Sequence, residues 1–467
     1  MTNSPMDSER LAKYLFIAVS AVTVSSALVG VGMVSAQRKW PIFVHTHSLY
    51  TSLLENFSEV EETSVLRPTS LLQPARYKGA GVTINEVPDA GEYVLLSGFF
   101  GEDSEIRLIR RDGTQVSRWP LSFSEIFRDA SYLSDPPATD WNVDTHGAIA
   151  MPDGSIVFNF DYTGMARIDR CGKVLWTLKR QTHHSVERAE SGGFWVPGQR
   201  FVKSEKNALY PPFDAPYADS TIMHVSEAGK VLREFSIVKV FYDNGLEALL
   251  TAAAIFYEAR PANAWNREIV HLNKVSELSS ALAPDFPMFE AGDLLLSFRN
   301  LNMLMVVSPR TLKVKWWRVG PWLRQHDAEF RAGGSVMVFN NNIYLTTAFK
   351  SGHDRTTKLT RLTVPRVSNV LELNVATGQS HIFYGGSKEQ PMLSVTRGKV
   401  DPMANGDVLV TEFDGGRVFE ANPAGEIVWQ YINRYDEDEV AEITEARVYP
   451  AGYFDSADFS CATRPSN

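Results

Sequence analysis

The chain has 467 residues, 44% of them hydrophobic and 22% charged, which is the composition of an ordinary globular protein. Its formal net charge is -9 and the sequence shows no basic stripe, which argues against nucleic acid as the main partner. This length could hold two or three ordinary domains, but a β-propeller uses as much chain for one, so internal repetition must decide the domain count.

The first predicted element is an uncharged apolar stretch over residues 14–36, which follows a short N-terminal tail (residues 1–13) and has two basic residues close to each end. Its length suits a helix that crosses a bilayer. The sequence Val34-Ser35-Ala36 also resembles a cleavage site, so a cleaved signal peptide is the alternative. We favour the anchor, because the apolar cores of signal peptides are usually shorter. Both interpretations export the remaining chain: as an anchored protein facing the periplasm or the outside of the cell, or as a secreted one.

Residues 37–80 are expected to form a connector, with a possible short helix over residues 47–60. From residue 81 to residue 454 the sequence repeats one unit: an extended segment, a turn with Gly, an apolar strand, a polar break and two further strands. Six copies can be laid along the chain, over residues 81–121, 146–178, 184–235, 271–320, 326–386 and 399–431. Residues 455–467 remain as a C-terminal tail.

Turn and strand chemistry support the repeat. Pairs such as Asp153-Gly154 and Asn405-Gly406 supply the positive φ angles that tight hairpins need. Trp176 and Trp429 end apolar strands, where an indole can pack on the next blade. The segment 443–454 is strand-like and is expected to close the ring by pairing with the first blade. The sequence therefore predicts an all-β protein: a six-bladed β-propeller preceded by one transmembrane helix.

The chain contains two cysteines, Cys171 and Cys461. A single disulfide that holds the C-terminal tail to a turn is conceivable, but the sequence cannot show whether the two thiols are close. Neither cysteine lies in a metal-binding spacing.

Four copies of the repeat carry a histidine near the start of their first strand. These are His146, His184, which follows His183, His271 and His326, while the first and sixth copies have Thr83 and Lys399 there. If equivalent positions face the same end of the axial channel, several imidazoles converge. A single histidine beside a strand is more often structural, and for His146 the structural interpretation is as good as the functional one.

Charged residues near these histidines have two interpretations each. Asp327 and Glu187 could orient imidazoles or cap turns. Arg299 could bind a tetrahedral oxyanion or form a surface ion pair. Imidazoles can also hold zinc or copper, but the ligands would come from separate blades and no HExxH motif is present, so a metal is less favoured. Neither a phosphate-binding loop nor a G-x-S-x-G motif is present, and no cofactor is predicted.

Several of these segments together resemble the bacterial arylsulfotransferases. They are HHSVE (residues 183–187), VHLNKV with GDLLLSFRNLN (270–302), WWRVGPWLRQHDAEF with GGSVMVFNNN (316–342) and NGDVLVTEFDGGRVFEANPAGEIVWQY (405–431). The resemblance implies a six-bladed propeller that transfers a sulfuryl group between phenols. It implies His326 as the nucleophile and His184, His271 and Arg299 as catalytic residues around the sulfate, and we add His183, His146 and Asp327 as expected substrate-binding residues.

On this basis we expect an aryl-sulfate:phenol sulfotransferase that works by a ping-pong mechanism through a sulfohistidine, without a nucleotide donor. The expected partners are a small aryl sulfate, a phenol and the membrane, and the oligomeric state stays open. Two alternatives remain: a non-catalytic propeller that binds a ligand or proteins, and an aryl-sulfate hydrolase that uses the same pocket with water as acceptor.

Overall fold

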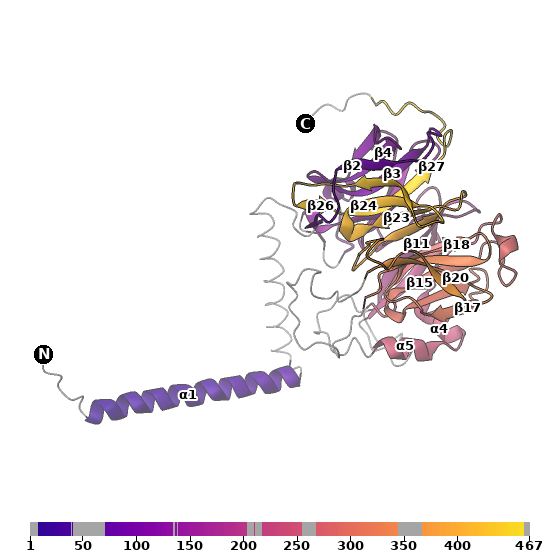
Figure 1. Cartoon of the computed structure of the whole chain (residues 1–467). Helices are drawn as coiled ribbons and strands as arrows, with labels where there is room; N and C mark the ends of the chain where they lie inside the picture. Colours follow the sequence, from indigo (N-terminus) through magenta and orange to yellow (C-terminus); the bar gives the residue numbers. More distant parts are fainter. Residues whose placement is uncertain are drawn as a thin grey trace. The chain divides into compact units, whose positions relative to one another are not determined.

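The repeat folds into five four-stranded antiparallel sheets and one five-stranded antiparallel sheet, so the predicted six-bladed β-propeller is confirmed (Figure 1). The computed structural model describes residues 8–38, 40, 71–133, 136–137, 139–202, 210, 217–254, 268–343 and 367–461. The predicted short helix over residues 47–60 lies outside these residues.

Each blade has an innermost strand beside the axis and an outermost strand near the surface. In this order the strands are β27 (Ile443–Tyr449), β3 (Tyr93–Phe100), β4 (Asp103–Arg110) and β5 (Gln115–Pro120) in the first blade; β6 (Thr145–Ala150), β7 (Ile156–Phe160), β8 (Gly164–Ile168) and β9 (Val174–Leu178) in the second; β10 (Glu187–Arg188), β11 (Phe194–Val202), β12 (Tyr217–Val225) and β13 (Val231–Ser236) in the third; β14 (Leu272–Glu277), β15 (Leu294–Phe298), β16 (Met303–Val307) and β17 (Val314–Val319) in the fourth; β18 (His326–Arg331), β19 (Ser335–Asn340), β20 (Asn369–Asn374) and β21 (Ser380–Gly385) in the fifth; β22 (Lys399–Pro402), β23 (Val408–Glu412), β24 (Arg417–Ala421) and β25 (Ile427–Ile432) in the sixth.

Short helices lie between strands. They are α3 (Phe123–Ile126), α4 (Ile237–Asp243), α5 (Glu247–Ala254), η2 (Asp140–Asn142), η4 (Ala283–Asp285), η5 (Arg299–Leu301) and η8 (Phe413–Gly415). Of these, η5 bears on the candidate site, because it begins at Arg299 directly after β15.

The ring closes by pairing the end of the propeller chain with its beginning. Strand β27 pairs with β3, from Ile443 opposite Gly98 to Tyr449 opposite Tyr93, as expected for the segment 443–454. The assignment of residues 81–85 to the first blade was wrong: β2 (Gly81–Asn85) pairs with β25 and forms a fifth strand of the sixth blade. Within the expected connector, β1 (Leu72–Pro74) pairs with β26 (Glu439–Ala441).

Tryptophans at strand ends tie neighbouring blades together. The indole N–H of Trp119 donates to the carbonyl of Arg170, that of Trp176 to Glu227 and that of Trp429 to Arg111. In each case the acceptor lies in a hairpin turn of the next blade. The predicted packing of Trp176 and Trp429 against neighbouring blades is therefore confirmed, and the hydrogen bond adds direction to the apolar contact.

The two cysteines form the disulfide that the sequence left open. The Sγ atoms of Cys171 and Cys461 are 2.00 Å apart. Beside the bridge, Phe459 packs edge-on against Trp119, with 6.2 Å between the ring centroids. The first part of the predicted C-terminal tail is thus attached to the propeller.

The N-terminal stretch forms one long helix, α1 (Ser8–Gln37), which contains the predicted residues 14–36. Residues 11–37 are long and apolar enough to cross a membrane, and they lie near the N-terminus, as a signal sequence also would. Together with the disulfide, this helix indicates an extracytoplasmic protein.

Candidate active site

The hairpin turn between the first two strands of each blade gives a common register. His146, His184 and His326 each lie five residues before the residue that opens this turn, which is Met151, Ala189 or Arg331. These three histidines are structurally equivalent, as predicted.

The other predicted register positions need correction. In the fourth blade Leu278 opens the turn, so Asn273 takes the equivalent position and His271 lies two residues earlier. In the sixth blade Met403 opens the turn and Gly398 is equivalent, one residue before Lys399. Thr83 lies on the outermost strand of the sixth blade and has no part in the register. Sequence spacing failed in these cases because insertions and the ring closure shift the count.

Irregular backbone aims the side chains at the start of the innermost strands. The pairing of β18 with β19 has a bulge between His326 and Ala328, and β14 has one between Leu272 and Lys274. His184, His271 and Asp327 have φ angles of 56, 53 and 48°. Such left-handed residues cost about 1–3 kcal/mol each and collect at functional sites. A bulge of this kind turns a side chain away from the regular alternation of the strand.

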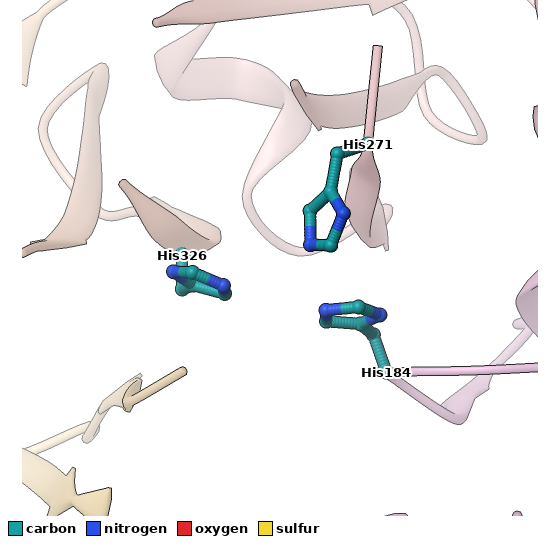
Figure 2. A group of neighbouring side chains, drawn as sticks. All are labelled: His184, His271 and His326. Carbon is teal, nitrogen blue, oxygen red and sulfur yellow. The ribbon is translucent and has the colours of Figure 1, made fainter. Parts of the chain in front are cut away.

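The imidazoles of four blades converge at one end of the axis. The ring centroid of His184 lies 4.2 Å from that of His146, 4.9 Å from that of His271 and 5.9 Å from that of His326. The centroids of His271 and His326 are 6.0 Å apart. Figure 2 shows His184, His271 and His326 reaching from separate parts of the chain toward a shared space. The predicted convergence is found.

Each histidine has a partner at its Nδ1 atom. Nδ1 of His146 lies 3.0 Å from a carboxylate oxygen of Asp161, and Nδ1 of His271 lies 2.5 Å from one of Glu268. His326 has a neutral partner, because its Nδ1 lies 2.7 Å from the amide oxygen of Asn341.

His184 is paired with the histidine that precedes it. The Nδ1 atoms of His183 and His184 are 2.7 Å apart, so the N–H of one ring donates a hydrogen bond to the other. His183 is fully buried and stacks on Tyr162, with 4.5 Å between their ring centroids. His183 therefore supports the site from behind His184.

Arg299 belongs to the site. Its Nη1 atom lies 3.4 Å from Nε2 of His271, and its backbone N–H donates to the carbonyl of His271 at 3.1 Å. This places a guanidinium, whose charge persists at all physiological pH values, beside the converging imidazoles. The alternative of a surface ion pair does not describe this position.

Burial keeps the imidazoles neutral. It lowers the pKa of His184, His271 and His326 well below the usual 6.5, and Arg299 adds to this effect on His271 and His326. Burial also lowers the pKa of His146 to about 3, against the opposing effect of Asp161. Near pH 7 the rings of the free site therefore hold lone pairs.

Sequence reasoning missed the groups behind these histidines. The hydroxyl of Tyr162 donates to Glu268 at 3.1 Å, and Glu268 in turn contacts His271. Glu268 lies three residues before its histidine, while Asp161 and Asn341 each lie 15 residues after theirs. A comparison of the repeats at the 15-residue spacing would have indicated Asp161 and Asn341.

Two predicted neighbours of the imidazoles face elsewhere. Asp327 lies 3.0 Å from Nζ of Lys274, and Glu187 lies 2.6 Å from the same atom. Neither carboxylate orients an imidazole, so that expectation was wrong, and Asp327 has no place among the converging rings. The positive φ of Asp327 and the bulge beside it separate its direction from that of His326.

The histidines also have the geometry of metal ligands. Ligand atoms of His184, His271 and His326 all lie within 4.8 Å of one another, as do those of His146, Asp161 and His184. Arg299 beside His271 opposes a cation there and can bind an anion. The charge beside the rings therefore favours an oxyanion over a metal ion.

The fold and the site together describe a six-bladed propeller with a cluster of histidines and an arginine where four of its blades meet. Residues 147–434, more than half of the chain, match the family model described as Arylsulfotransferase (ASST). The chain belongs to this family of enzymes, and membership suggests arylsulfotransferase activity.

The chain is similar to several solved structures at low sequence identity. A protein of unknown function from Bacteroides caccae has 14% identity over 76% of this chain and 97% of that chain, with a TM-score of 0.45. Virginiamycin B lyase from Staphylococcus aureus has 10% identity over 76% of this chain and 89% of its own, with a TM-score of 0.36. A streptogramin B lyase has 9% identity over 80% of this chain and 97% of its own, with a TM-score of 0.39. No curated protein matches the chain significantly.

Proposed function

We propose that the protein transfers a sulfuryl group from an aryl sulfate to a phenol through a covalent intermediate on His326. The observation that carries this proposal is the convergence of three neutral imidazoles, His184, His271 and His326, with Arg299 at a site shaped for an oxyanion. Family membership supplies the substrate class.

In the first half-reaction, the lone pair on Nε2 of His326 attacks sulfur. The N–S bond forms while the bond from sulfur to the aryl oxygen breaks, and the phenolate leaves with the electron pair. Charge in such a loose transition state spreads over the oxygens, so the protein contributes mainly position and electrostatic stabilisation. Arg299 and N–H groups of His184 and His271 are the donors near those oxygens.

In the second half-reaction, an acceptor phenol gives its proton to His271, which the first half-reaction left neutral, and attacks the same sulfur. The N–S bond breaks, and its electron pair returns to Nε2 of His326. The enzyme is then unchanged and no nucleotide donor has been consumed. This fits an exported chain in which the sequence shows no phosphate-binding loop.

Substrate binding causes the site to take up the proton that the leaving phenolate later receives. The free site has neutral histidines because burial and Arg299 lower their pKa. An aryl sulfate brings a negative charge, which raises the pKa of the adjacent imidazoles. His271, with Glu268 at its Nδ1 atom, is the ring best placed to hold that proton and to pass it to the phenolate.

We place the propeller in the periplasm, held to the membrane by α1. The support is the length of its apolar stretch, which exceeds the usual core of a signal peptide.

The test is release of a chromogenic phenol from its sulfate ester by the detergent-purified full chain, with and without a second phenol. We expect release that depends on the acceptor and is lost in His326→Ala. A suitable control is His381→Ala, because the side chain of His381 is 65% exposed on the outermost strand of the fifth blade.

The same assay separates the alternatives. Release that does not depend on an acceptor would indicate an aryl-sulfate hydrolase. Absence of release with several donors would overturn the proposal and leave a binding propeller.

A further inference from the structure

Two blades carry the same histidine with different partners. In the second blade Asp161 follows β7 and contacts Nδ1 of His146, and in the fifth Asn341 follows β19 and contacts Nδ1 of His326. The spacing is 15 residues in both pairs. The protein has thus placed a carboxylate behind one ring and a neutral amide behind its equivalent.

The orientation of Asn341 follows from its other hydrogen bonds. Its Nδ2 atom donates to the carbonyls of Ser394 and Arg397, both at 2.8 Å. Carbonyls accept only, so the amide nitrogen must face them and the oxygen must face His326. Asn341 is fully buried, and these two bonds use both hydrogens of its NH₂ group.

This orientation determines where His326 carries its proton. An amide oxygen accepts but cannot donate, so Nδ1 of His326 must bear the hydrogen. An independent contact agrees: the backbone N–H of Arg397 donates to Nε2 of His326 at 3.3 Å, which requires a lone pair there. Both contacts select the same tautomer, and the long hydrogen bond from Arg397 must break before the single lone pair of Nε2 can attack sulfur.

We propose that Asn341 is a positioning residue that fixes His326 in the Nδ1–H tautomer and so presents Nε2 as the nucleophile. The proposal rests on the function proposed above. When Nε2 attacks, the N–S bond forms, the S–O bond to the aryl group breaks and the phenolate takes the electron pair. The proton on Nδ1 stays with the ring and is held by Asn341, so the intermediate is a sulfo-imidazolium.

The neutral partner also distinguishes His326 from its neighbours. A carboxylate behind an imidazole stabilises the cationic ring, as Asp161 does for His146 and Glu268 does for His271. An amide gives the Nδ1 proton a partner without adding negative charge, so the sulfo-imidazolium keeps its tendency to release the group. The groups that act on His326 from the other blades include His146, His184, His271, Arg299 and the backbone N–H of Arg397, and none of these is an anion.

The first experiment reads the tautomer directly. Nitrogen-15 chemical shifts of the labelled full chain, without substrate, separate a protonated from an unprotonated ring nitrogen, and His326→Ala identifies the signals. We expect Nδ1–H and an unprotonated Nε2 for His326. An Nε2–H tautomer in the wild type would overturn the proposal without any variant.

The second experiment removes the amide oxygen of Asn341, which accepts the hydrogen bond from Nδ1 of His326. Asn341→Leu should allow the Nε2–H tautomer and lower kcat about 10²–10⁴-fold, the range from the loss of a hydrogen bond that orients a reactive side chain to a wrong tautomer. The affinity for the aryl sulfate should change less than about threefold, because Arg299, His184 and His271 stay in place. A fall in affinity with kcat unchanged would contradict a role in positioning the nucleophile.

Asn433→Leu is the matched control. Asn433 is also a buried amide whose Nδ2 donates to two backbone carbonyls, those of Phe99 and Ala441, but its amide contacts no histidine. It should lose similar stability and keep the tautomer of His326. If both variants lose kcat equally, the effect of Asn341 is structural and the proposal fails. If His326→Ala retains transfer, the proposed function fails, while the tautomer measurement still stands.

Discussion

Two layers on the same innermost strands of this propeller treat polar side chains in opposite ways. In the histidine layer, His184, His271 and His326 satisfy Nδ1 with a partner and turn the rings toward a shared space. In the adjoining ionic layer, Lys274 contacts Glu187, Asp327 and Glu329, and Arg447 contacts Glu187. The charged groups of the ionic layer pair with one another. The rings of the histidine layer instead face a shared space where a substrate can bind.

Protonation follows the same division. In the ionic layer, although burial opposes it, Arg447 and Lys274 hold the pKa of Glu187 at about 2. Burial raises the pKa of Glu329 to about 8 against the effect of Lys274. In the histidine layer burial keeps the rings neutral. The ionic layer therefore holds charge for the fold, and the histidine layer holds lone pairs for chemistry.

The largest effect should come from removing the nucleophile. His326→Ala should lower kcat about 10⁴-fold or more, as losing a nucleophile does in enzymes with covalent intermediates. Stability should change little, because the ring is part of the layer that faces the substrate. Acceptor-dependent phenol release measures the effect on kcat, and thermal unfolding measured in parallel gives the effect on stability. A variant that unfolds in proportion to its lost activity would place His326 with the structural residues.

Replacing the arginine should have the next largest effect. Arg299→Lys keeps the charge but loses the planar fork, so kcat/KM should fall about 10²–10³-fold, the cost of one lost oxyanion donor. Titration calorimetry with inorganic sulfate should show weaker binding. Arg180→Lys, on a partly buried ion pair with Glu234, is the control. Equal sulfate affinity in wild type and Arg299→Lys would remove Arg299 from the anion site.

A substitution in the ionic layer should lower the free energy of unfolding. Lys274 is 1% exposed, and Lys274→Met leaves its carboxylates without their cation. Removing one partner from a buried pair costs about 3–5 kcal/mol, so the midpoint of urea unfolding should fall clearly. The kcat of the molecules that remain folded should stay near that of the wild type. A loss of kcat with unchanged stability would show that Lys274 takes part in catalysis and would contradict the division into two layers.

The smallest effect concerns pH. The pKa of His271 and of His326 lies well below 6.5 in the free site, and a bound anion raises it. Sulfate should therefore bind with uptake of a proton and bind more tightly as pH falls. Between about pH 8 and about pH 6 we expect up to tenfold per proton per pH unit where uptake is complete, and less where it is partial. Sulfate affinity that rises with pH would have the wrong sign for this explanation.

Repetition made most of the fold predictable. Turn pairs and tryptophan-ended strands recur often enough to indicate six blades, and the strand-like segment 443–454 indicated the closure. The blade to which residues 81–85 belong could not be predicted. An edge strand with this pattern could pair with the first blade or with the sixth, and it pairs with the sixth. That choice depends on three-dimensional geometry.

The convergence of side chains was predictable where residues recur and unpredictable where it depends on backbone direction. Recurrence indicated that His184, His271 and His326 lie together, and the resemblance indicated Arg299 beside them. Asp327 was misassigned, because a bulge and a φ of 48° send it to Lys274. Asn341 was missed because an amide carries no charge to draw attention to it.

The closure of the ring also acts as a check on the completeness of the chain. Strand β3 is buried along its whole length, and its inner neighbour β27 is among the last segments of the propeller to be made. A polypeptide that stops before residue 443 has five whole blades but leaves the apolar strand YVLLSGFF with an open edge, and such edges promote aggregation. Truncated products should therefore be recognised and removed as unfinished proteins, while the complete propeller exposes no such edge on β3.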